Sequence, residues 1–141
     1  MRIVLDTNVV ISALLWRGEP FHLFQAIRQN EHAQLFTSAA LLQEMAEVLT
    51  RTTLAKRLAL INLTARNALA AYINAVELVR PIFIPAVVTA DPDDDQVVAA
   101  AVAAQADLLV TGDHDLLALG SYRGIRIVSP VEAVGILTGR S

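Results

Sequence analysis

The chain has 141 residues, contains no cysteine, and is 55% hydrophobic. This length predicts a single domain over residues 1–141 with a substantial core, and the absence of thiols excludes disulfides and thiolate metal sites. The net charge of −3 excludes a protein that binds nucleic acid through bulk positive charge.

The apolar residues are dispersed and broken by charges, so no stretch approaches the ~20 residues needed to span a bilayer. The first residues lack the basic region and cleavage site of an export signal, which together with the missing cysteines favours a cytoplasmic location. Ten of the eleven basic residues are arginine, the side chain suited to forked contacts with phosphate. The candidates for contacts with a phosphate backbone are Arg17, Arg51, Arg123 and Arg126.

The first half of the chain reads as short buried strands separated by helices. Residues 3–5 form an apolar run without alternation, typical of a strand buried on both faces. Helices are then predicted over 9–15 and 21–29, a strand over 35–37, and helices over 39–50, 54–60 and 64–75. Ser38 is a suitable N-cap for the third of these helices.

The second half continues the same alternation. Predicted strands cover 77–79, 107–110 and 125–128, and an extended segment covers 81–88. Helices are expected over 97–106, between the last two strands, and from a capping box at Ser129 and Glu132 to about Leu137. This order predicts an α/β fold in which three layers, α/β/α, surround a central, mainly parallel sheet.

Four acidic residues crowd into Asp91-Pro92-Asp93-Asp94-Asp95, just ahead of the apolar helix 97–106. Carboxylates at this spacing repel one another. One N-cap would explain a single aspartate, and a hard cation held by oxygen ligands would explain several.

Other carboxylates are expected at the same edge of the sheet. Asp6 follows the first strand and Asp113 follows the strand 107–110, while Glu44 borders the buried face of its helix and Glu47 points outward. A site of about four carboxylates suits one or two ions of Mg²⁺ or Mn²⁺. Two such ions, roughly 3.5 to 4 Å apart, would promote phosphodiester cleavage.

Asp6-Thr7-Asn8, Glu44, Asp95 with Val98-Ala99-Ala100, and Thr111-Gly112-Asp113 together resemble a PIN domain, similar to the VapC-like ribonuclease toxins of type II toxin–antitoxin modules. The resemblance implies that Asp6, Glu44, Asp95 and Asp113 are the catalytic metal ligands. It also implies that Thr111 steadies the site and that Asn8 is a supporting polar group. Asp93 or Asp94 could share the ligand role of Asp95, and Asp115 competes with Asp113 for the same role.

The same resemblance implies an RNA substrate, a homodimer and an antitoxin that blocks the cleft. Two other hypotheses stay open. Asp6 could be the nucleophile of a phosphatase or phosphotransfer protein, although the position two residues later is Asn8 and the only lysine is Lys56. Alternatively, the chain could be a non-catalytic PIN-like binding module.

Overall fold

The computed structural model describes residues 1–82 and 92–139, with no account of the side chains of Pro92 and Asp93. Strands and helices alternate along the chain. In order, the elements are β1 (Arg2–Leu5), α1 (Thr7–Leu15), α2 (Glu19–Gln29), β2 (Gln34–Ser38), α3 (Ala39–Leu49), α4 (Thr52–Leu60), α5 (Ala65–Ile73), β3 (Val76–Val79), α6 (Pro92–Ala103), β4 (Leu108–Val110), α7 (His114–Leu119), β5 (Ser121–Tyr122), β6 (Ile125–Val128) and α8 (Pro130–Leu137).

The sheet has the strand order β3-β2-β1-β4-β6-β5. All neighbouring pairs are parallel except β5 and β6, which form an antiparallel hairpin. From β1 the chain moves outward to β2 and β3, and then returns to place β4 on the other side of β1. The carboxyl ends of β1 and β4 therefore meet where the strand order reverses, which is where open α/β sheets bind their ligands.

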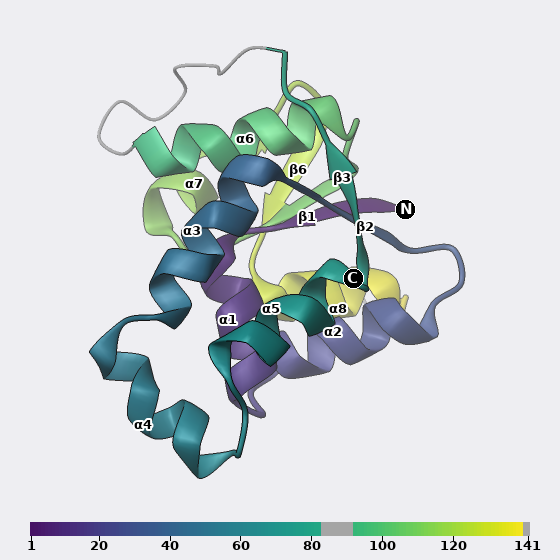
Figure 1. Cartoon of the computed structure of the whole chain (residues 1–141). Coiled ribbons are helices and arrows are strands. Elements are labelled where there is room, and N and C mark those ends of the chain that lie inside the picture. The colour runs from purple at the N-terminus through teal and green to yellow at the C-terminus, as the bar shows by residue number, and fades with distance from the viewer. Residues whose placement is uncertain (83–91, 140–141) are drawn as a thin grey trace.

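Helices cover both faces of the sheet, as Figure 1 shows, with α6 on one side and α1, α2, α5 and α8 on the other. A hydrophobic core lies on each face of the sheet, and the strands contribute to both because their successive side chains point to opposite faces. In β1, Ile3 and Leu5 join the core beneath the α1 and α2 layer, whereas Val4 joins the core beneath α6. The predicted three-layer α/β/α fold is confirmed.

The predicted order of strands and helices agrees with the structure except for β5, a two-residue strand that the sequence does not predict. Residues 83–88 of the predicted extended segment lie outside the described residues. Within the described part of the chain, no helix is long and apolar enough to cross a membrane.

Candidate functional site

Asp6 and Thr111 mark the reversal of strand order at the carboxyl edge of the sheet. Asp6 follows β1 and its backbone N–H donates to the Val110 carbonyl at 2.9 Å, so it continues the β1–β4 pairing. Thr111 follows β4, is fully buried, and its N–H donates to the carbonyl of Val128 at 3.0 Å. The backbone hydrogen bonds of the sheet thus fix the backbone of both residues independently of their side chains.

A chain of side-chain hydrogen bonds connects Asp6 with Asp113. The Thr111 hydroxyl donates to Asp6 Oδ2 at 2.7 Å and accepts from the Asp113 N–H at 3.0 Å. Asp6 Oδ1 accepts from the Thr7 N–H at 2.8 Å at the start of α1. The Asp6 carboxylate is therefore held in one orientation by donors from two different elements.

Three carboxylates converge at this edge, as Asp94, Asp113 and Asp115 each place an oxygen within 4.8 Å of the other two. Asp94 lies in the first turn of α6 and is only 5% exposed. Asp113 is half-buried and caps α7, because its Oδ1 accepts from the N–H groups of Asp115 and Leu116 at 2.8 and 3.2 Å. The first turns of α6 and α7 thus bring three carboxylates together.

Within the acidic run, the family resemblance points to Asp95, with Asp93 or Asp94 able to share its role. Among the described residues, Asp94 and not Asp95 belongs to the group that meets Asp113 and Asp115. Asp95 is half-buried on the same helix turn. Asp91 and the side chain of Asp93 lie outside the described residues.

Glu44 lies on α3, which packs against both α1 and α6. It is half-buried whereas Glu47 is exposed, which is the orientation that the apolar stripe of α3 predicts. Glu44 and Asp6 are not members of the three-carboxylate group. Asn8, one position into α1 from Thr7, is exposed.

The arginine candidates separate into two groups. Arg17 follows the carboxyl end of α1 and Arg51 precedes α4, and both are exposed. Arg123 lies in the turn between β5 and β6, and Arg126 pairs with Leu108, the first residue of β4. The second group therefore lies toward the amino ends of the parallel strands, away from the edge that carries the acids.

The electrostatics of the three-carboxylate group favour a bound cation. Two ionised carboxylates within 4.8 Å repel by about 1 kcal/mol in water and by roughly 3 to 4 kcal/mol near a protein surface. Protein fold and helix caps hold these groups together despite that repulsion. Three oxygen donors, without nitrogen or sulfur, are the ligand set that suits Mg²⁺ or Mn²⁺.

Comparison with known proteins places this chain in a family. The sequence model of the PIN domain matches residues 2–115, which include every acidic candidate named above. The chain belongs to the PIN-domain family. Among curated proteins, no match to this PIN-domain chain was found.

Solved structures add a likeness in fold. The crystal structure of VapBC2 from Rickettsia felis, bound to a DNA fragment from the promoter of its genes, contains a chain that superposes on this PIN domain with a TM-score of 0.60. The sequence identity is 13%, and the match covers 92% of this chain and 98% of the other. At that identity the likeness concerns the fold.

Proposed function

We propose that this PIN domain is a divalent-metal-dependent endoribonuclease that hydrolyses phosphodiester bonds in RNA. The observation that carries the proposal is the meeting of Asp94, Asp113 and Asp115 within 4.8 Å at the point where the strand order reverses. Membership of the PIN-domain family supports a nuclease. The metal and the RNA substrate are our inference.

In this proposal, Asp94, Asp113 and Asp115 bind Mg²⁺ or Mn²⁺, with Asp6 and Glu44 completing an acidic pocket of one or two ions. Such an ion supplies an activated water and stabilises the charge that develops on the phosphodiester. Thr111 is a positioning residue, because its hydroxyl holds the Asp6 carboxylate and the Asp113 backbone together. Asp95, on the same turn of α6, has no ligand role in this proposal, because the three-carboxylate group does not include it.

A cleavage assay with matched aspartate variants tests this proposal. The purified chain should cut RNA with Mg²⁺ or Mn²⁺, stop when EDTA is added, and recover when the metal is restored. Asp113→Asn should lower the cleavage activity by more than the roughly 10- to 100-fold decrease that follows loss of a group next to the metal ligands. Asp107→Asn is the control. Asp107 immediately precedes β4, at the end of that strand opposite to Asp113, and its carboxylate accepts a hydrogen bond from the Arg2 N–H.

Two results would contradict the proposal. One is RNA cleavage that continues unchanged in EDTA. The other is equal loss of activity in Asp113→Asn and Asp107→Asn, which would indicate a general effect of the substitution on folding.

The phosphotransfer alternative places the nucleophile on Asp6. Both oxygens of that carboxylate accept hydrogen bonds, from the Thr7 N–H and from the Thr111 hydroxyl. This arrangement suits an anchored acidic group better than an attacking one, since hydrogen bonding to the charged form lowers its nucleophilicity. Failure to trap an acyl-phosphate on Asp6 with a phosphodonor would agree with this reasoning.

We further propose that the chain acts in the cytoplasm as the toxin of a toxin–antitoxin module, as a homodimer restrained by an antitoxin protein. The Rickettsia felis structure, a VapBC2 complex on promoter DNA, supports this proposal through its similar fold. Expression of the chain alone should inhibit growth, co-expression of an antitoxin should relieve that inhibition, and light scattering should give twice the mass of the 15.2 kDa chain. Monomeric protein that does not inhibit growth would contradict the toxin role.

A further inference from the structure

Positive charge is concentrated in one part of this acidic chain. Residues 48–76 contain four basic residues and no acidic one, which is the longest stretch of the sequence without a carboxylate. Since the whole chain carries −3, the remainder carries −7. RNA approaching the acidic pocket is therefore repelled by most of the protein and attracted by this stretch.

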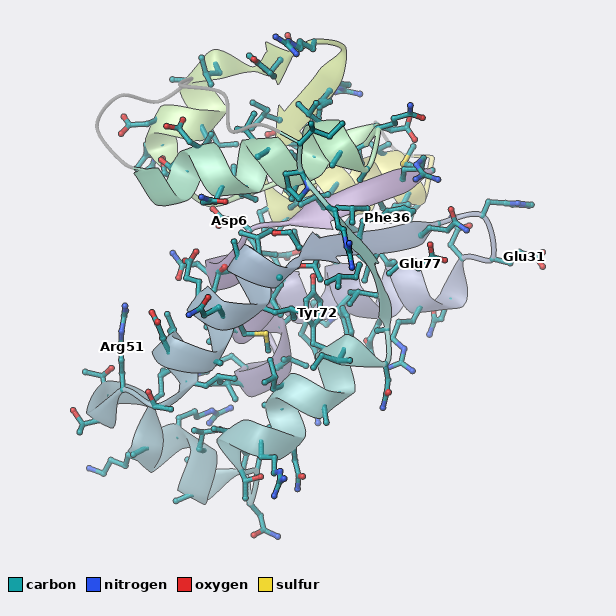
Figure 2. The ribbon with its side chains drawn as sticks, turned by 45° about the horizontal axis from the view of Figure 1, so that its top comes forward. Asp6, Glu31, Phe36, Arg51, Tyr72 and Glu77 are labelled. Atoms are coloured by element: carbon teal, nitrogen blue, oxygen red, sulfur yellow. The ribbon has the colours of Figure 1, made fainter. Side chains whose placement is uncertain are left out.

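The acid-free stretch includes α4, the helix that extends farthest from the sheet in Figure 1. Its inward side packs on the core through Leu58, whereas Arg51 and Lys56 are exposed on its outer side. Figure 2 shows Arg51 at the outer edge of the molecule with its side chain directed away from the helices. Lysine and arginine presented in this way suit contacts with a phosphate backbone.

The tryptophan at the end of α1 lies beside the same helix. The Arg57 guanidinium is 5.5 Å from the centroid of the Trp16 ring, and Arg57 Nε donates to the Leu15 carbonyl at 2.6 Å. These two contacts fasten α4 to the end of α1 and hold the indole. Trp16 is nevertheless 42% exposed, and it is the one aromatic residue among the large hydrophobic side chains exposed in the described structure.

The distance along α1 from Asp6 to this tryptophan suits a short piece of single-stranded RNA. Helix α1 starts at Thr7, next to Asp6, and ends at Leu15, so its nine residues span about 14 Å. That length corresponds to roughly four phosphates of a stacked strand. Along α4, Arg51 lies about 9 Å from Arg57, within reach of one or two further phosphates.

We propose that Trp16, Arg17, Arg51 and Lys56 form a surface that binds the single-stranded RNA substrate beside the acidic pocket. An unpaired base stacks on the Trp16 indole, and Arg51 and Lys56 bind the phosphates that follow it. The choice of RNA as the ligand rests on the proposed ribonuclease function. A double-stranded substrate would not present an unstacked base to the indole.

The chain contains a single tryptophan, so its intrinsic fluorescence reports on Trp16 alone. We would titrate the full-length wild-type chain in EDTA with an unlabelled decauridylate, and measure binding of a fluorescein-labelled decauridylate by anisotropy. The proposal predicts quenching of tryptophan emission with the same midpoint as the anisotropy change. Trp16→Leu should weaken binding about five- to 150-fold, the range for loss of one stacked base, and Trp16→Phe should restore part of the affinity.

The salt dependence of binding tests the contacts of Arg51 and Lys56 with phosphates. Arg51→Gln with Lys56→Gln should lower the slope of log affinity against log salt by about 1.4, since each phosphate contact on a single strand contributes about 0.7. Arg126→Gln is the matched control, because it removes one exposed arginine near the amino ends of the strands and should leave the slope unchanged. Circular dichroism of each variant checks its fold.

Three outcomes would overturn the proposal. The first is decauridylate that binds without changing Trp16 emission, and the second is a decaglutamate peptide that quenches Trp16 when decauridylate does not. The third is a Trp16 quantum yield that changes with protein concentration but not with decauridylate. The second would indicate an acidic protein partner and the third a contact between copies of the chain. A parallel cleavage assay with Mg²⁺ separates the two proposals. Quenching without cleavage supports the RNA-binding surface and contradicts the nuclease, whereas cleavage without quenching does the reverse.

Discussion

Replacing Thr111 by valine should weaken the link between the two strand ends that carry the acids. Valine has nearly the same shape as threonine, so the fully buried site keeps its packing and loses only the hydroxyl. The change removes one hydrogen bond to the Asp6 carboxylate and one from the Asp113 N–H. A hydrogen bond to a charged group contributes about 1.5–3 kcal/mol and a neutral one about 0.5–1.5 kcal/mol.

The expected loss in the free energy of unfolding is therefore about 2–4 kcal/mol. With a urea m-value of about 2 kcal/mol per M, the unfolding midpoint should fall by roughly 1–2 M. The measurement is urea unfolding followed by circular dichroism in EDTA, so that metal binding does not contribute to stability. Mn²⁺ binding by the same variant should also weaken, because Asp6 and Asp113 lose their shared positioning group.

Thr111→Ser is the matched control, since it keeps the hydroxyl and removes one buried methyl group worth about 1 kcal/mol. We expect the serine variant to bind Mn²⁺ like the wild type and to be more stable than the valine variant. Equal stability and equal Mn²⁺ affinity of Thr111→Val and Thr111→Ser would refute the role assigned to the hydroxyl.

Three further substitutions test other parts of the fold. Burial raises the pKa of Tyr72 above its ordinary value of 10.0, and its hydroxyl has no hydrogen-bond partner among residues 1–82 and 92–139. Because only the unfolded state then ionises readily, the free energy of unfolding should be unaffected by this group below pH 10 and should fall as the pH rises further. Tyr72→Phe should abolish that fall and, in urea unfolding at pH 7, gain about 1 kcal/mol of stability. A less stable variant would contradict this reasoning. Ser129→Ala removes the acceptor of the Glu132 N–H in the capping box of α8, and thermal unfolding should show a loss of about 1 kcal/mol. Gly124→Ala, at φ +83° in the β5–β6 turn with open space around it, should cost about 1 kcal/mol through the backbone alone, and unchanged stability would argue against that turn.

The caps of α3 and α8 could be predicted because each depends on a few neighbouring residues, whereas α6 begins at Pro92, five residues before the predicted start at residue 97. Ser38 caps α3 and Ser129 forms the predicted capping box, as local polar residues before apolar stripes indicate. Asp6 could be placed at the carboxyl edge because a short apolar run precedes it. The half-buried position of Glu44 follows from the helical repeat of α3 in the same way.

The choice among the aspartates of α6 could not be made from the sequence. Positions three and four residues after Asp94 are Val97 and Val98, and those after Asp95 are Val98 and Ala99, so both aspartates begin an apolar stripe. A helix that is apolar almost all round gives no signal of which face meets the sheet. The packing of α6 against β1, β2 and β4 determines which aspartate meets Asp113 and Asp115, and that packing is tertiary.

The β5–β6 hairpin was missed for a different reason. Its turn consists of Arg123 and Gly124, which have φ of 49° and 83°. Two successive positive φ values are the mark of a hairpin turn, but the favoured first residues there are asparagine, aspartate and glycine. An arginine at that position carries no hairpin signal in the sequence.

The proposed nuclease depends most on Asp94 acting as a ligand in a divalent-cation site with Asp113 and Asp115. Isothermal titration of the metal-stripped chain with Mn²⁺ tests it directly, with Asp95→Asn as the control on the neighbouring position. We predict that the wild type binds Mn²⁺, that Asp95→Asn remains near the wild type, and that Asp94→Asn loses at least about 10-fold in affinity. Wild-type affinity in Asp94→Asn, or no Mn²⁺ binding by the folded wild-type chain, would contradict the account.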